Sequence, residues 1–141
     1  MKISDILRYK GSNVVTIAPS ADVRTLLSEL AEHNVGALLV SLDSRVIGVV
    51  SERDLVRKLN SLQGDLLQAK VEDIMTTNVI SCSSDDALDE VAQTMTDRRI
   101  RHMPVIDDGA LVGIVTIGDV VLNRSRELEQ QRRDLEQYIT G

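Results

Sequence analysis

The sequence predicts an α/β fold of the α+β kind, in which tandem β-α-β-β-α repeats pack sheet to sheet with pseudo-twofold symmetry. Three observations predict it. The chain aligns with itself at a shift of 65 residues, each copy has one apolar stripe at helical spacing, and each copy ends on the pattern Gly-hydrophobic-hydrophobic-Ser/Thr-x-x-Asp. Because one such repeat cannot cover its own sheet, we expect the two to share a core.

The self-alignment has few identities, and it is carried by residue types. The shift of 65 places Gly48 on Gly113 and Asp54 on Asp119 with no gap between them. We therefore expect a first repeat over residues 1–65, a second over residues 66–124 and a helical C-terminal tail over residues 125–141.

The two copies differ at their start. Residues 4–7 (SDIL) resemble residues 72–75 (EDIM) at a shift of 68, so the first copy has three extra residues around Tyr9 to Gly11. Each copy then continues with a brief apolar stretch, over residues 14–17 and 79–82, that predicts a short strand.

A helix start signal follows each brief strand. Pro19-Ser20 and Ser83-Ser84 are each followed by acidic residues, which suit the positive end of a helix. Apolar residues then recur at spacings of three, four and seven, as on a helix with one buried face. This stripe comprises Val23, Leu26, Leu27, Leu30 and Val35 in the first copy, and Leu88, Val91, Ala92, Met95 and Ile100 in the second.

A hairpin and a second helix complete each copy. Turn residues, DSR in one copy and DDG in the other, separate two apolar runs and predict antiparallel strands. The second strand ends at the repeated motif, which begins a helix. We expect the first hairpin strands over Ala37 to Leu42 and Met103 to Ile106, and the second helices from Leu55 to about Asn60 and from Val120 onward.

The repeats are joined by a polar segment and followed by a charged tail. Residues 61–70 contain one glycine and are expected to form the join. In the tail, Val121, Leu128 and Leu135 are seven residues apart, and Ile139 lies four further on. This narrow stripe predicts a helix that leans on a partner surface, such as a second subunit. A solvated helix extension is the alternative.

The composition is that of an ordinary globular domain, with 43% hydrophobic residues in 141. The apolar runs fall far short of the roughly 20 residues that cross a bilayer, and the N-terminus lacks the apolar core of a signal peptide, so we expect a cytoplasmic protein with no membrane association. The single cysteine, Cys82, cannot form an internal disulfide, and no Cys/His spacing predicts a metal site.

The charge balance disfavours general nucleic-acid binding. Sixteen basic and 22 acidic residues give a net charge of −6, and two tyrosines are the only aromatic residues available for stacking on bases. A small anion needs only a local cluster of cations. One such cluster is Arg98, Arg99, Arg101 and His102.

The repeated motif has two interpretations. Ser51 to Asp54 and Thr116 to Asp119 each fit a capping box, in which a hydroxyl and an acid satisfy the first amides of a helix. However, aspartate is shorter than the usual Glu or Gln, so its carboxylate is expected to point outward. At the carboxyl end of a strand, such an acid can take the diol of a ribose while the helix N-terminus faces a phosphate.

Two such motifs in one frame resemble a pair of cystathionine-beta-synthase (CBS) domains, joined as a Bateman module. The resemblance includes EDIM (residues 72–75), RHMPV (residues 101–105) and GIVTIGD (residues 113–119), and it covers nearly the whole chain except the tail. SERDLVRK, residues 51–58, further resembles small stand-alone bacterial modules of this type.

The resemblance implies a regulatory protein that binds AMP, ADP, ATP, NAD(H) or S-adenosylmethionine in clefts between the repeats. It also implies a homodimer, and its output would act on an unknown effector protein. The expected ribose contacts are Asp54, Asp119, Ser51 and Thr116, and the expected base contacts are Thr16, Ile17, Val35, Gly36, Ala37, Ser81, Cys82, Ile100 and Met103. The expected phosphate contacts are Arg53, Arg101, His102, Ile117, Gly118 and Arg124.

The copies differ within this frame, which predicts two sites of unequal affinity or ligand. Gly118 gives a phosphate close access to backbone, whereas the first copy has Arg53 there. A surface role for Arg101, a structural role for His102 and a salt bridge for Arg124 stay open. No catalytic triad, phosphate-binding loop or paired-histidine motif is found in the sequence, so we expect no enzyme. The rival functions are an NAD(H) redox sensor and a ligand-free dimerisation scaffold.

Overall fold

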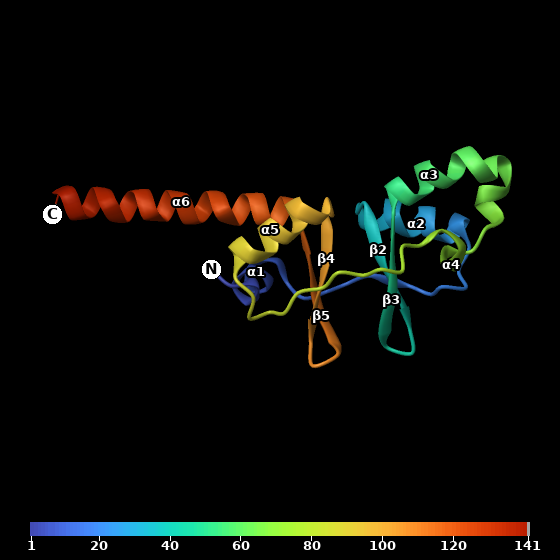
Figure 1. The fold of residues 1–141 in the computed structure, drawn as a ribbon, viewed down its shortest axis with the longest axis horizontal. Coiled ribbons are helices and arrows are strands. Elements are labelled where there is room, and N and C mark those ends of the chain that lie inside the picture. The colour runs from blue at the N-terminus through green and yellow to red at the C-terminus, as the bar shows by residue number, and fades with distance from the viewer. Residues whose placement is uncertain (141) are drawn as a thin grey trace. The chain divides into compact units, whose positions relative to one another are not determined.

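A computed structural model describes residues 1–140, which form two compact units (Figure 1). The α3 unit comprises Asn13–Ile80 and Asp108–Leu111, and the α6 unit comprises Met1–Ser12, Ser81–Asp107 and the chain from Val112 onward. The compact units therefore differ from the sequence repeats. Residues 1–12 pack with the second repeat, and residues 108–111 pack with the first.

The α3 unit contains a three-stranded sheet with the order β1-β2-β3. The strand β1 is parallel to β2, and β2 is antiparallel to β3. Its elements are β1 (Thr16–Ile17), α2 (Val23–His33), β2 (Ala37–Leu42), β3 (Arg45–Ser51), α3 (Glu52–Leu62), the 3-10 helix η1 (Gln63–Gln68) and α4 (Val71–Ile74). The predicted bounds of the first hairpin strand, Ala37 to Leu42, are those of β2. The segment predicted as a polar join, residues 61–70, continues α3 and forms η1.

The α6 unit contains a two-stranded hairpin with three helices. Its elements are α1 (Ile3–Lys10), α5 (Leu88–Arg98), β4 (His102–Asp107), β5 (Ala110–Thr116) and α6 (Ile117–Thr140). The strand predicted over residues 79–82 is absent from this part of the described chain, where Cys82 makes one isolated parallel bridge to Val105. The predicted tail is, as far as residue 140, the outer part of α6, which runs well past α5 (Figure 1), and Gly141 lies outside the described residues.

Both hairpins turn through residues with a left-handed backbone, as the turn composition predicts. Asp43 and Ser44 have φ values of 50° and 64°, and Asp108 and Gly109 have values of 50° and 79°. Two consecutive residues with positive φ match the right-handed twist of the flanking strands. Both turns therefore return the chain directly into its partner strand.

The helices begin at residues other than those predicted. The N-cap of α2 is Asp22, whose carboxylate accepts from the amide and the hydroxyl of Thr25 at 2.8 Å each. In the α6 unit, Ser83 and Ser84 donate to the carboxylate of Asp107, so they hold the end of β4 and do not cap α5. Hydroxyl-rich segments thus serve strand ends as well as helix starts.

The predicted apolar stripes supply much of each core. In the α3 unit, Val23, Leu26 and Leu30 are buried, whereas Leu27 and Val35 are 42% and 39% exposed. In the α6 unit, the stripe of α5 is buried along its whole length, at Leu88, Val91, Ala92 and Met95. The face of α2 around Leu27 is therefore apolar and uncovered, unlike the same face of α5.

The glycine of each repeated motif is closely approached by a side chain from another element of the same unit. A Cβ atom at Gly113 would lie 2.7 Å from Cδ2 of Leu7, and one at Gly48 would lie 2.7 Å from Sδ of Met75. Leu7 follows Ile6 on α1, and Met75 follows Ile74 at the end of α4, so the two contacts are equivalent. Glycine at this position lets α1 and α4 approach β5 and β3 closely.

No helix in the described part of the chain is long and apolar enough to cross a lipid bilayer.

Replacing Gly48 by alanine is expected to lower the free energy of unfolding by about 1–3 kcal/mol, because overpacking a filled site displaces its neighbours. The new Cβ would also lie 3.0 Å from the carbonyl oxygen of Thr76, which cannot move as a side chain can. Urea unfolding followed by circular dichroism measures the loss. Gly64→Ala is the matched control, since a Cβ there meets nothing within 4 Å. Equal losses in the two variants would contradict this account of the motif glycine.

Candidate functional site

Two strand-helix junctions carry the repeated motif. At the end of β3, the Ser51 hydroxyl accepts from the amide of Asp54 at 3.4 Å, and at the end of β5 the Thr116 hydroxyl accepts from the amide of Asp119 at 3.2 Å. Each hydroxyl is thus the N-cap of the helix that follows, so α3 and α6 begin at Glu52 and Ile117, one turn earlier than predicted.

The carboxylate of Asp54 accepts hydrogen bonds from residues of its own junction and from Thr76. Its Oδ2 accepts from the amide of Ser51 at 2.8 Å and from the Ser51 hydroxyl at 3.1 Å. Its Oδ1 accepts from the hydroxyl of Thr76 at 3.2 Å, and Thr76 is fixed by two backbone hydrogen bonds to Val49. Asp54 is 8% exposed, so this carboxylate is held by three donors in a largely buried place.

Asp119 has a cationic partner. Its Oδ2 accepts from the amide of Thr116 at 2.9 Å and from Nζ of Lys10 at 2.6 Å. Burial alone would raise the pKa of Asp119, but the hydrogen bond from Lys10 and that from the Thr116 amide outweigh it and hold the pKa below its ordinary value. Both of these hydrogen bonds fall on Oδ2, and a carboxylate has about four acceptor positions in all. Asp119 is therefore ionised at neutral pH, with acceptor positions left for a further donor.

The carboxylates do not point outward as the sequence suggested. Each reaches back to the amide of its own N-cap residue, as in a capping box, because the extended backbone of that residue places the amide within reach of a side chain as short as aspartate. A carboxylate has about four acceptor positions. Capping occupies part of them and leaves acceptor capacity at both Asp54 and Asp119.

In the α3 unit, the residues predicted to contact a base lie on β1, at the start of β2 and just before β2. The register pairs Ala37 with Ser51, and the carbonyl of Gly36 accepts from the amide of Glu52 at 3.0 Å. The segment before β2 therefore lies at the start of α3. Ile17 and Ala37 have their side chains in the core, and Thr16 is exposed on β1.

A hollow of about 410 Å³ lies beside this junction. Two predicted base contacts, Val35 and Gly36, line it together with Glu52 from the first turn of α3. Its wall is otherwise made by α2 and α3, through Leu27, Leu30, Ala31, Asn34 and Leu55. None of these last residues was predicted as a ligand contact, although Leu27 and Leu30 belong to the predicted stripe.

The α6 unit repeats the backbone geometry of this junction. The carbonyl of Arg101 accepts from the amide of Ile117 at 2.9 Å, as that of Gly36 does from Glu52. The structure thus brings the backbone of Arg101, a predicted phosphate contact, to the start of α6 beside Ile117 and Gly118. The Arg101 side chain is exposed, while Ile100 and His102 are half-buried and Met103 lies in the core.

Ser81 and Cys82 precede this unit's hairpin. Ser81 is exposed, whereas Cys82 is buried and its amide donates to the carbonyl of Pro104 at 3.0 Å. Burial, with smaller contributions from Asp86 and Asp107, raises the pKa of the Cys82 thiol to about 12. A protonated, buried thiol packs as a small apolar group.

Two predicted phosphate contacts lie on the outer surface of their helices. Arg53 is exposed next to Asp54 on α3. Arg124 forms an exposed ion pair with Asp89 at 3.8 Å, the ordinary salt bridge that the sequence left open. One turn after Asp119, the buried Asn123 donates from Nδ2 to the carbonyl of Asp119 at 2.7 Å. Asn123 thereby supports the first turn of α6, a role that its sequence position did not signal.

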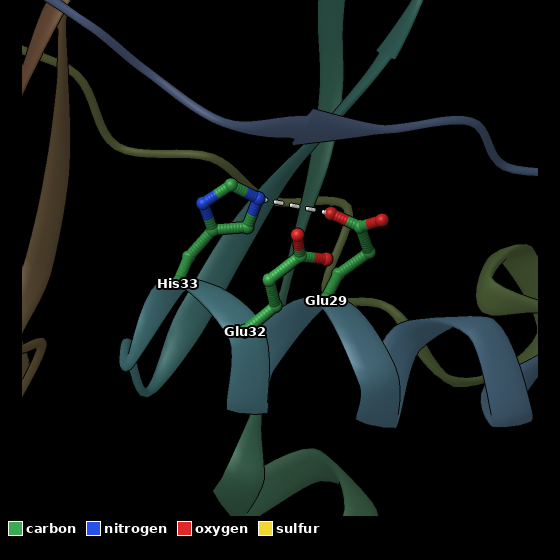
Figure 2. A group of neighbouring side chains, drawn as sticks. All are labelled: Glu29, Glu32 and His33. Carbon is green, nitrogen blue, oxygen red and sulfur yellow. Dashed lines mark hydrogen bonds and ion pairs between the residues drawn. The ribbon is translucent and has the colours of Figure 1, made fainter.

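His33 has two acidic neighbours on α2. On the last turn of α2, Nε2 of His33 lies 3.1 Å from Oε2 of Glu29, and Glu32 points to the same side (Figure 2). Donor atoms of the three side chains lie within 4.8 Å of one another. They are the group in the described chain whose donors could meet on one cation, but His33 and Glu29 already satisfy each other as an i,i+4 pair at a partly exposed helix end.

The family model for the CBS domain matches residues 3–61 and 71–125. The chain therefore belongs to the CBS-domain family, as the two motifs indicated. A mitochondrial CBS-domain-containing protein of Arabidopsis thaliana, CBSX3, is 34% identical over 148 residues, covering 99% of this chain and 72% of the relative.

Solved structures of CBS-domain proteins confirm the α+β fold of paired repeats. A CBS-domain-containing protein of Agrobacterium tumefaciens has a TM-score of 0.85 and 38% identity, covering 88% of this chain and 99% of that one. The CBS domain pair of protein MJ0100, solved in complex with 5′-methylthioadenosine and S-adenosyl-L-methionine, has a TM-score of 0.79 and 27% identity, covering 90% and 98%.

Asp119→Asn is expected to cost more stability at pH 7 than at pH 3. The folded pKa of Asp119 lies below its ordinary value of 3.8, so its ionised form stabilises the fold above about pH 4, and this contribution fades as the pH falls through the folded pKa. For a partly exposed pair we expect a difference of about 1 kcal/mol at pH 7. Urea unfolding at pH 3, 5 and 7 measures it against Asp65→Asn, an exposed control. A pH-independent difference would refute the ionic role of Asp119.

Proposed function

We propose that the protein is a regulatory module that binds an adenine nucleotide at its two strand-helix junctions and reports it to a partner protein. One observation carries the proposal. Each junction presents an aspartate with remaining acceptor capacity beside the N-terminus of a helix, at Asp54 and at Asp119. The remaining acceptor positions of a carboxylate can take ribose hydroxyls, and the positive end of a helix favours a phosphate.

The relatives support an adenosine-type ligand. The MJ0100 pair, which shares this fold, was solved with two ligands that both contain adenosine. AMP, ADP, ATP and NAD(H) carry the same adenosine group, so the junctions suit this class. We propose Ser51 and Thr116 as further ribose contacts and the segments before β2 and β4 as base contacts.

The proposed role is binding and signalling rather than catalysis. Asp54 and Asp119 are fixed in position by their caps, a property that suits recognition, whereas a general acid or base must exchange a proton. A ligand alters the output only if it binds one arrangement of the protein better than another. We place this action in a reducing compartment such as the cytoplasm, on an effector protein that the sequence does not identify.

Nucleotide binding is expected to raise the melting temperature of the wild-type protein. A ligand at 100 times its dissociation constant stabilises the folded state by about 2.7 kcal/mol. Asp54→Asn and Asp119→Asn together are expected to weaken binding at least ten-fold, because a hydrogen bond to a charged group contributes roughly 1.5–3 kcal/mol. Thermal shift and calorimetry with AMP, ATP and NADH measure both effects, with Asp65→Asn as the control.

The pattern of ligands separates the proposal from its rivals. A preference for NADH over AMP would favour a redox sensor. No thermal shift with any of these nucleotides would remove the proposed function and leave a dimerisation scaffold.

A scaffold role is the second candidate, and the outer part of α6 favours it. Val121, Leu128 and Leu135 are 61%, 65% and 63% exposed on one face of this helix, and Ile139 is 80% exposed. Exposed apolar side chains at a seven-residue spacing are the seam of a helix pair. We propose that α6 joins two copies of the chain, whichever ligand the junctions bind.

Leu128→Glu with Leu135→Glu is expected to convert a dimer into a monomer, because each charge would be buried opposite its own copy. Size-exclusion chromatography with light scattering measures the mass. Gln130→Glu with Gln137→Glu adds the same charge on the opposite face of α6 and is expected to leave the mass unchanged. A wild-type protein that is monomeric at high micromolar concentration would exclude this interface.

A further inference from the structure

Lys10 gives the two junctions different charges. Its Nζ donates to Oδ2 of Asp119 at 2.6 Å and to the carbonyl oxygen of Ile114 at 2.9 Å. The side chains of Lys10 and Asp119 are 29% and 21% exposed, so water screens this ion pair only in part. An ammonium has three donors. Two are used here, and the third remains for another acceptor near Asp119.

The position of Lys10 depends on the length of α1. This helix has eight residues, whereas α4 at the equivalent place in the first repeat has four. The additional turn of α1 ends at Lys10, before Gly11 stops the helix with a φ of 91°. Ile3 and Ile6 are buried and fix α1 on its unit. The three extra residues of the first repeat therefore bring a cation to the aspartate of the second.

Asp54 has no equivalent cation. In the α3 unit, α4 ends at Ile74, and the chain then places the neutral hydroxyl of Thr76 on Asp54. No ion pair to Asp54 is found within the described chain. The described contacts of Asp54 are thus all with neutral donors, whereas Asp119 is paired with the ammonium of Lys10. A cation in contact with the carboxylate favours a negatively charged ligand group nearby, and only the Asp119 junction has such a contact among the described residues.

The start of α6 also leaves room for such a group. A Cβ atom built at Gly118 would have Thr116 Oγ1, at 3.6 Å, as its nearest neighbour, so the backbone there is open to close approach. The equivalent position in α3 is occupied by Arg53. An accessible backbone at Gly118, a carboxylate paired with a cation and a further donor on that cation thus occur together at the Asp119 junction.

We propose that Lys10 is a specificity-determining residue that makes the Asp119 junction select ribosides carrying a phosphate over uncharged ribosides. The proposal rests on the proposed function, since it assumes that Asp119 receives a ribose. The phosphate accepts the free donor of Lys10, while Oδ1 of Asp119 accepts the ribose hydroxyls. The Asp54 junction, which has no equivalent of Lys10, lacks this preference for a phosphate.

Calorimetry with AMP and adenosine tests the selection on the full-length protein. Asp54→Asn is introduced first, so that the Asp119 junction is read alone. In that background we expect AMP to bind at least ten-fold more tightly than adenosine. Adding Lys10→Met is expected to reduce this ratio to about one by weakening AMP alone, and adding Lys10→Arg is expected to preserve it.

Arg8→Met is the matched control for this series. Arg8 lies on the same helix and its loss changes the net charge equally, but its side chain is 79% exposed, with only a 3.7 Å contact to Asp5. The AMP to adenosine ratio is expected to survive this change. A ratio that falls equally in Arg8→Met and Lys10→Met would show a general charge effect and overturn the proposal.

The remaining outcomes separate this inference from the proposed function. If the wild-type protein binds neither AMP nor adenosine, both fail. If it binds AMP but Lys10→Met leaves the ratio unchanged, or tightens both ligands by removing a competitor for Asp119, only the role of Lys10 fails. If Lys10→Met loses both ligands through a damaged fold, Lys10→Arg decides: a preserved ratio supports the proposal and a ratio of one overturns it.

Discussion

The hydrogen bonds between a hydroxyl and an aspartate at each strand-helix junction are the constraint on which the rest of the structure depends. The Ser51–Asp54 and Thr116–Asp119 pairs set where α3 and α6 begin and fix each aspartate side chain in one position. A single cap contributes only about 1 kcal/mol. Its larger effect is geometric, because a fixed carboxylate can receive a ligand without first losing side-chain freedom. Capping and recognition are thus two uses of the same atoms.

The structure also shows what sequence patterns specify well. The repeat, the hairpin turns and the apolar stripe of α5 were all predictable, since each depends on residues near one another in the chain. The bounds of β2 follow from a continuous apolar run between turn residues. The residue type alone did not predict the role of a hydroxyl that can either begin a helix or hold the end of a strand. Ser83 and Ser84 look like a helix start but hold Asp107, and the carboxylates expected outside turn back to their caps.

The features that escaped prediction are those in which one part of the chain completes another. Lys10 reaches Asp119 across 109 positions of sequence, and Thr76 reaches Asp54 across 22. No periodicity or spacing marks such partners. The sequence did contain one signal, since the shift of the self-alignment changes from 65 to 68 near Tyr9. This change indicated a longer segment in the first repeat, but it did not indicate which residues that segment contacts. Differences between copies of a repeat therefore indicate where the two sites will differ. Which residues make the difference is seen only in the three-dimensional structure.

The placement of α1 has a consequence for how the chain is made. The residues of α1 are synthesised before their partners in the same unit, since Leu7 packs on Gly113 and Lys10 pairs with Asp119. The α3 unit lies almost wholly between these segments and can be completed earlier in synthesis. Until those partners are made, the side chains of Ile3 and Ile6, which are buried in the folded unit, stay uncovered. Contacts between residues so far apart in the sequence form slowly. We therefore expect α1 to be the last helix of its unit to dock.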